Sequence, residues 1–209
     1  MTVASIRTGF LNKYLGIAVD GEALPWPSAD RDIYIGQALA QAWPDIGKRA
    51  SATAATAQGS DVYTIPLVGG VTMKISRIEL EQTLGGILGR AGKVTNWQTY
   101  SDTQVRITPH LATVSGLNLR FFGWVPYLVD ATDIPARLES TIAMRAAAIA
   151  YGVLAGQLVN LRRQQGLDSP RVVDYQTAVG LSAYWERRYF EQVQKDPARI
   201  AIAPRRGRR

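Results

Sequence analysis

The spacing of the hydrophobic residues changes twice along this chain of 209 residues, and that change limits the folds it can adopt. Residues 2–43 and residues 134–193 repeat their apolar side chains every three or four positions, which is typical of helices. Between them, residues 61–125 contain short runs rich in β-branched side chains, which favour strands. We therefore predict an α+β protein: an α-helical bundle with a small antiparallel β-rich insertion.

Two helices are predicted in the first region, residues 1–60. The first covers residues 2–16, and the second runs from Ser28, as its N-cap, to about Trp43. The inward side chains of the second helix are predicted to be Ile33, Ile35, Leu39 and Trp43. Residues 51–60 are alanine, threonine and serine for the most part, which predicts a loop because few large side chains are present to pack.

The β-rich region is predicted to cover residues 61–128. A hairpin joins 62–67 to 71–80 through Gly69 and Gly70, and three further strands cover 97–100, 104–108 and 117–125. The glycine-rich stretch between residues 85 and 92 is predicted to be a flexible connection.

A helical hairpin is predicted for residues 129–196. Its first helix contains Ile134, Leu138 and Ile142 at helical spacing, and its second begins at Ser169-Pro170. The second helix is predicted to bury Val172, Val179, Ala183, Phe190 and Val193. The small side chains of Ala143, Ala147 and Ala150 let another helix approach closely, from this chain or from a neighbouring subunit, and our prediction assigns them to subunit packing.

Positive charge is concentrated at the C-terminal end. The chain has 24 basic and 17 acidic residues, a net charge of +7, and residues 195–209 hold six of the basic residues against one acidic residue. Residues 197–209 are therefore predicted to form an extended basic tail after a single structural domain. A basic block of this kind is typical of a solvated, flexible tail or of an arm for an acidic partner, nucleic acid included. As an arm, its contact residues are predicted to be Arg199, Arg205, Arg206, Arg208 and Arg209.

The composition excludes several kinds of chemistry. The chain has no cysteine and a single histidine, His110, which excludes thiol nucleophiles, thiolate zinc sites and histidine-pair metal sites. No Ser-x-Gly elbow lies near His110, so we predict a histidine in a turn. The longest apolar run, 146–156, is shorter than the ~20 residues of a membrane span, and no secretory signal is evident. We therefore expect no membrane contact and synthesis in the cytoplasm.

Three further patterns are compared with catalytic or binding motifs. Gly92-Lys93 ends a glycine-rich stretch, but Ile87 and Val94 stand where a phosphate loop needs glycine and a hydroxyl residue. Glu79 and Glu81 would share one face of a strand, with Asp61 upstream, but the lysine of the common nuclease pattern is absent. We predict surface acids paired with arginine at Glu79 and Glu81, with Arg77 or Arg90 as the partner, and turn and cap roles for Asp130 and Asp133.

The aromatic residues near the end of the last predicted strand are a third candidate, because aromatic rings can stack on nucleobases. Arg120 is the only basic residue beside them, so core packing and subunit contact explain them better, with Phe121 and Trp124 assigned to subunit packing. We predict no catalytic residue, no cofactor site and no metal site, and thus no enzyme.

The order of these pieces, from about residue 28 to residue 195, resembles the head-tail connector adaptor proteins of tailed bacteriophages. The resemblance is carried by the strand ending Phe121-Phe122-Gly123-Trp124, the step Asp133-Ile134-Pro135, and the helical stretch Met144-Arg145-Ala146-Ala147-Ala148. It is a resemblance of order and texture, because the family has no invariant catalytic signature.

The resemblance implies a structural protein of the virion neck, with the host cytoplasm as its location during assembly. Copies would form a ring, commonly of twelve, beneath the portal protein and extend the channel for double-stranded DNA, with the next neck or tail protein below. The C-terminal segment would dock on the portal. The alternatives are a stopper or tail-completion neck protein, a non-specific DNA-binding protein acting through its arginine tail, and a hydrolase using Glu79 and Glu81.

Overall fold

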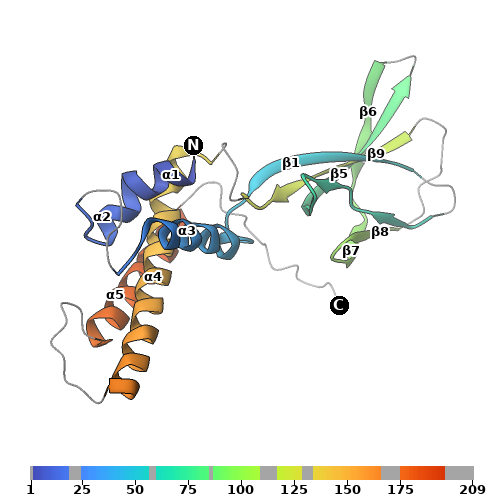
Figure 1. Cartoon of the computed structure of the whole chain (residues 1–209). Helices are drawn as coiled ribbons and strands as arrows, with labels where there is room; N and C mark the ends of the chain where they lie inside the picture. The colour runs from blue at the N-terminus through green and yellow to red at the C-terminus, as the bar shows by residue number, and fades with distance from the viewer. Residues whose placement is uncertain are drawn as a thin grey trace. The chain divides into compact units, whose positions relative to one another are not determined.

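The computed structural model describes residues 2–18, 25–56, 60–84, 87–108, 117–128, 134–165 and 175–195, with the backbone alone at 82–84, 87–91 and 160–165. The chain divides into two compact units (Figure 1). The helical unit comprises Met1–Ile46 and Pro126–Arg209, and the sheet unit comprises Gly47–Val125. Helices and antiparallel sheets in separate units confirm the predicted α+β class.

The helical unit begins with a continuous helical segment made of α1 (Val3–Ile6), a π-helical turn, η1 (Arg7–Leu11), and α2 (Asn12–Tyr14). Thr2 and Ser5 form a reciprocal capping box at its start, satisfying amides that have no partner inside the helix. Ile6, Leu11 and Leu15 are buried, so the helix predicted over residues 2–16 is confirmed.

Helix α3 covers Ser28–Ala42, with two differences from the prediction. Its N-cap is Pro27, whose carbonyl accepts the Arg31 amide at 3.1 Å, and Ser28 is the first helical residue. Ile35 and Leu39 are buried as predicted, but Ile33 is 55% exposed. It lies on the opposite side of the helix from Ile35, because two residues are about 200° apart around an α-helix.

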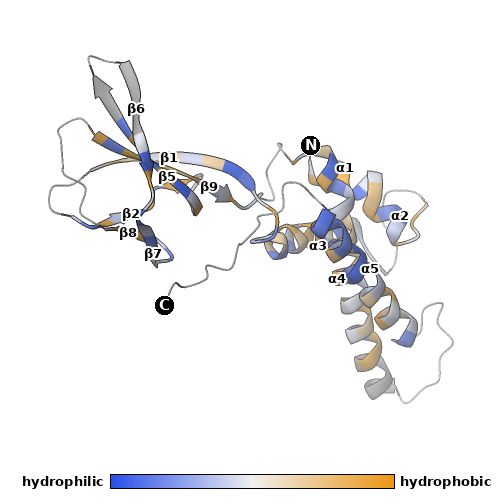
Figure 2. Ribbon diagram, turned by 180° about the vertical axis from the view of Figure 1, so that it is seen from behind, coloured by the Kyte–Doolittle hydropathy of each residue, from blue (hydrophilic) through white to orange (hydrophobic). Residues whose placement is uncertain are grey.

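The two long helices are α4 (Ala136–Gln165) and α5 (Tyr175–Lys195), which lie side by side (Figure 1). Hydrophobic residues recur along α4 (Figure 2), and Ile134, Leu138 and Ile142 are buried as their spacing predicts. The predicted buried stripe of α5 is wrong for most of its members. Val193 is buried, but Ala183 is exposed and Val179 and Phe190 are 42% and 45% exposed. Ala178 and Tyr189 face the core instead. Val172 and the predicted Ser169-Pro170 start lie outside the described residues.

By length and composition alone, the stretch Ala136–Val159 of α4 could cross a bilayer, with a mean hydropathy of 1.5 in its most apolar window. Half of that window is buried inside the protein, and core helices of soluble proteins meet the same criterion. Two charged residues of the stretch are also bound within the helical unit: Glu139 accepts a hydrogen bond from Ser5 at 3.1 Å, and Arg145 pairs with Glu186.

The described residues of the sheet unit form three antiparallel sheets. The largest has the strand order β1-β9-β5-β6, with β1 at Lys48–Ala55, β9 at Leu117–Val125, β5 at Lys74–Leu84 and β6 at Ile87–Val94. The second has the order β2-β8-β7, formed by Val62–Thr64, Gln104–Ile107 and Trp97–Ser101. Strands β3 (Leu67–Val68) and β4 (Val71–Thr72) pair across Gly69 and Gly70, whose φ angles of 59° and 80° confirm the predicted turn.

Three predictions for the sheet unit are wrong. The predicted hairpin is confined to Leu67–Val68 and Val71–Thr72, because β2 pairs with β8 and β5 pairs with β9 and β6. Residues 48–55 are strand β1, paired along its length with β9, where the sequence predicted a loop from residue 51. The sheet unit consequently starts at Gly47, whereas the β-rich region was predicted to start at residue 61. Residues 87–94 are strand β6, where a flexible connection was predicted. Gly92, at φ 140°, lies beside the register shift between Leu80 and Glu81, so this glycine accommodates an irregular step in the strand.

One face of the four-stranded sheet packs into a hydrophobic core. Phe121, Leu119 and Ile78 are fully buried there, and the small side chains Ala50, Ala52 and Ala54 of β1 pack against the same cluster. Since side chains alternate between the two faces of a strand, the residues between these positions lie on the opposite face. This second face of the sheet carries most of the charged residues described below.

Candidate functional site

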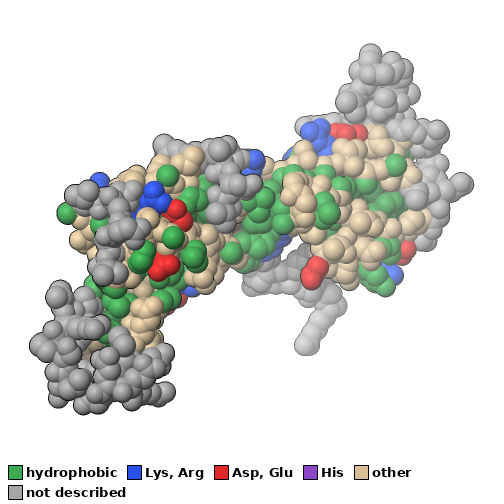
Figure 3. All heavy atoms as spheres, in the orientation of Figure 1, with side chains coloured by type: hydrophobic (Ala, Val, Ile, Leu, Met, Phe, Trp, Pro, Cys, Tyr) green, Lys and Arg blue, Asp and Glu red, His purple; other side chains and the backbone are tan. Residues whose placement is uncertain are grey.

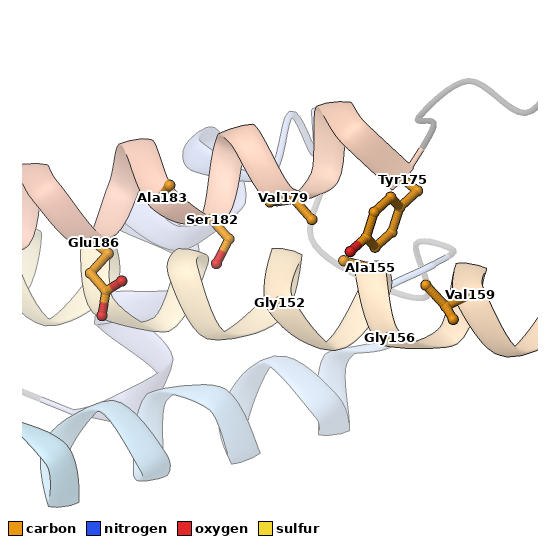
Figure 4. Close-up of a pocket in the computed structure, with 9 residues that line it drawn as sticks. All are labelled: Gly152, Ala155, Gly156, Val159, Tyr175, Val179, Ser182, Ala183 and Glu186. Carbon is orange, nitrogen blue, oxygen red and sulfur yellow. The ribbon is translucent and has the colours of Figure 1, made fainter.

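Small residues and apolar side chains line a groove of about 560 Å³ between α4 and α5. Figure 4 shows Tyr175, Val179 and Ser182 of α5 facing the glycines of α4. The Ser182 hydroxyl donates a hydrogen bond to the Ala148 carbonyl at 2.8 Å and holds the two helices together at this level. The groove is lined by Gly152, Ala155, Gly156, Val159, Tyr175, Val179, Ser182, Ala183 and Glu186.

Apolar residues at the surface continue from this groove along both helices. Val153 of α4 is 38% exposed, and on α5 Tyr175, Val179, Ala183 and Phe190 are all exposed. We call these five residues, together with Gly152 and Gly156, the outward apolar stripe. Figure 3 shows apolar side chains reaching the surface of the helical unit on the face turned to the viewer.

Among the described residues, nothing requires glycine at position 156. A Cβ built there meets nothing within 4 Å, and glycine inside a helix costs about 0.5–1 kcal/mol relative to alanine. At Gly152 a Cβ would make ordinary contact, 3.5 Å from the Ser182 hydroxyl oxygen. The two glycines therefore leave the α4 backbone open to close approach from outside the chain.

Charged and aromatic side chains elsewhere on α4 and α5 connect this helix pair to the rest of the helical unit. Arg145 of α4 pairs with Glu186 at 2.5 Å and donates to the Gln41 side chain at 2.9 Å. The ring of Trp185 stacks on Tyr14 with centroids 4.4 Å apart. Burial, reinforced by Asp45 and opposed by Arg145, raises the pKa of Tyr189 to about 12. Tyr189 is thus neutral over the whole physiological range.

The alanines assigned to subunit packing lie inside the chain. Ala143, Ala147 and Ala150 are fully buried in the core of the helical unit, where α4 meets its own neighbouring helices. Phe121 is fully buried in the sheet core, and Trp124 is half-buried on the second face of the sheet. The sequence left open whether the helix packed closely against these alanines belongs to this chain or to a neighbouring subunit. In the structure it belongs to this chain.

Glu79 and Glu81 lie on the same face of β5, as their spacing predicts, but they are only 8% exposed. Arg77 binds Glu79 at 3.1 Å, and Arg120 binds Glu81 at 2.8 Å. The predicted pairing of Glu79 with Arg77 is confirmed. Glu81 pairs with Arg120 of β9, which the sequence did not predict. Within the described ranges no group of three or more acidic or histidine side chains is placed to hold a metal ion.

The sequence did not reveal how many cations surround the aromatic residues of β9. Arg77 of β5 lies directly opposite Phe122, with its guanidinium carbon 4.2 Å from the ring centroid, and Arg120 approaches the same ring at 5.0 Å. Trp124 lies between Arg49 of β1 and Lys74 of β5. The pairing of β1 and β5 with β9 brings these cations together, and no local sequence pattern encodes that pairing.

Several predicted positions lie outside the part of the chain that the structure describes: His110, Asp130 and Asp133, and every arginine assigned to the tail, Arg199, Arg205, Arg206, Arg208 and Arg209. Of the stretch compared with a phosphate loop, the part from residue 87 onward belongs to strand β6, while Gly86 is not described.

Comparison with solved structures finds a similarity to a neck structure. A chain of the structure described as "Neck of empty GTA particle computed with C6 symmetry" aligns with a TM-score of 0.31 and 13% identity, covering 88% of this chain and 88% of that chain. A TM-score of this size does not establish a shared fold. No protein-family model and no curated protein matches the sequence.

Proposed function

We propose that this protein is a structural component of the neck of a phage-like particle, a head-tail connector adaptor that forms a ring beneath the portal. The outward apolar stripe carries the proposal. Val179, Ala183 and Phe190 are apolar residues at helical spacing along α5, and all three are exposed. Contact with another copy of the chain would cover them, and Gly152 and Gly156 give that copy close access to α4.

The sequence resemblance supports the same function, since it runs through both units in order. Its two motifs that lie wholly within the described residues have clear structural roles: residues 121–124 belong to the central strand β9, and residues 144–148 belong to the long helix α4. A structural role needs no active site, and both carboxylates of the nuclease-like pattern are bound by arginine side chains.

In this proposal the ring has about twelve copies, extends the DNA channel, and contacts the portal above and the next neck or tail protein below. The basic tail meets either acidic portal grooves or channel DNA. A stopper or tail-completion protein is the alternative within the same neck, and the two differ in which ring the protein touches.

The test is cryo-electron microscopy of the protein mixed with the portal protein of its own particle. We expect a ring bound beneath the portal, with the stripe on α4 and α5 covered by the adjacent copy. A ring bound only to a tail component would instead support the stopper. A monomer that binds neither partner would refute the neck function.

A further inference from the structure

The second face of the four-stranded sheet carries charged and aromatic side chains in regular cross-strand rows. One row contains Arg49, Trp124 and Lys74, and the next contains Ser51, Phe122 and Arg77. The third row contains Thr53, Arg120, Glu79 and Lys93. We call the five cations of these rows, Arg49, Lys74, Arg77, Lys93 and Arg120, the sheet cations.

The cations are better exposed than the anions on this face. The side chains of Arg77 and Arg120 are 42% and 41% exposed, whereas those of Glu79 and Glu81 are 10% and 11% exposed. Five cations stand against two carboxylates here, and Arg49, Lys74 and Lys93 have no ion-pair partner among the described residues. A partner approaching this face therefore meets a net positive surface.

Two of the cations are held in place before any partner arrives. Arg77 and Arg120 each bind a largely buried carboxylate and each lie against the Phe122 ring. These contacts limit the rotamers of both side chains, so less conformational entropy is lost when their remaining N–H groups bind a ligand. Guanidinium groups fixed in this way suit phosphate oxygens, which accept paired hydrogen bonds from them.

The spacing of the sheet cations favours an extended polyanion. Consecutive rows are two residues apart along β9, about 7 Å, and the three rows span about 13 Å. A DNA strand presents one phosphate for every ~3.4 Å along the helix axis. We infer that this face binds the phosphate backbone of double-stranded DNA without reading its sequence. This inference does not depend on ring formation, and the sheet cations are different residues from the arginines of the basic tail.

The test isolates the sheet from the tail while keeping the full chain. In a background of Arg205→Gln, Arg206→Gln, Arg208→Gln and Arg209→Gln, binding to a fluorescent 30-base-pair duplex is measured by anisotropy between 50 and 200 mM salt. Arg49→Gln with Lys74→Gln removes two sheet cations. Lys13→Gln with Lys195→Gln removes two exposed cations from the helical unit as the matched control.

We expect the sheet double variant to lower the slope of log K against log salt by about 1.8, because each lost phosphate contact removes about 0.9. The background protein then loses about 12-fold more affinity than the sheet variant across this salt range. The control should change the slope by much less. Circular dichroism establishes that every variant is folded.

Three outcomes would overturn the inference. The background chain could fail to bind the duplex at all, or the sheet and control pairs could weaken binding equally, which would indicate general electrostatic attraction. Binding of polyglutamate but not of the duplex would assign the face to an acidic protein. None of these results bears on ring formation at the portal, which is measured separately.

Discussion

At the scale of single residues, Tyr189 is a buried side chain whose hydroxyl group makes no hydrogen bond with the described residues. It is 2% exposed. A buried hydroxyl without a partner costs about 1–3 kcal/mol. We predict that Tyr189→Phe raises the free energy of unfolding by about 1 kcal/mol, measured by urea denaturation. Tyr184→Phe is the control, because that hydroxyl is at the surface and accepts a bond from Arg188 at 3.3 Å.

The same substitution changes the response to alkaline pH. Because the pKa of Tyr189 rises from 10.0 to about 12 on folding, the unfolded chain ionises first and the folded state loses stability as pH rises through this interval. Tyr189→Phe should flatten the stability profile between pH 10 and 12. An unchanged profile in the variant would contradict the assignment.

Gly123 is glycine because of a close backbone approach. A Cβ there would overlap the carbonyl oxygen of Lys74 and lie 2.8 Å from Cγ of Met73. We predict that Gly123→Ala destabilises the sheet unit by about 1–3 kcal/mol, as overpacking does, measured by thermal denaturation. Gly180→Ala in α5 is the matched control. Nothing lies within 4 Å of its added Cβ, and we expect it to stabilise the protein by up to about 1 kcal/mol. Equal effects of the two variants would refute the steric explanation.

At the scale of elements, we predict that a charged residue in the outward apolar stripe of α4 and α5 prevents ring assembly while the chain still folds. Val179→Glu places a charge on a residue that is 42% exposed in the single chain, so its thermal stability should be nearly unchanged. If the stripe lies between subunits, the variant should fail to form rings with the portal, as measured by mass photometry and electron microscopy. Ile33→Glu is the control, since Ile33 is apolar and 55% exposed on another helix. Normal assembly of Val179→Glu would place the subunit contact elsewhere.

The elements that the sequence predicted correctly are those whose signal is local. Helical spacing located α3 and α4, and the Gly69-Gly70 pair located its hairpin turn. Strands β1 and β6 were missed because small side chains and glycines in them carry little strand signal, and pairing with β9 and β5 decides their structure. The periodicity of α5 was real, but two overlapping apolar patterns are present, and only packing against α4 shows that Ala178 and Tyr189 are the inner ones.

At the scale of the whole molecule, the net charge does not reveal that positive side chains gather on one face of the sheet unit. Residues before 195 carry a net charge of only +2, which argues against a broad binding face outside the tail. The structure gathers five cations from four strands on one face of a sheet, while most of the acidic residues that balance the sum lie elsewhere in the chain. Pairing between strands that are distant in the sequence produces this surface. The cluster of sheet cations therefore could not be predicted from residues adjacent in the sequence.

We predict that the basic tail contributes to attachment to the portal protein and not to the stability of the fold. Replacing Arg205, Arg206, Arg208 and Arg209 with glutamine removes four of the charges that follow residue 195. We expect unchanged thermal stability and weaker, less salt-dependent attachment to the portal, measured by co-sedimentation at several salt concentrations. Unchanged attachment would count against a docking role for the tail.

The division of the chain into units has a consequence for its biosynthesis. The helical unit is assembled from the two ends of the chain, Met1–Ile46 and Pro126–Arg209, and the sheet unit lies between them. A ribosome adding about 5–20 residues per second therefore releases all of the sheet unit before α4 has emerged. During that interval the apolar faces of α1 to α3 have no α4 to cover them. The nascent N-terminal helices should consequently be a binding site for chaperones until the last third of the chain is made.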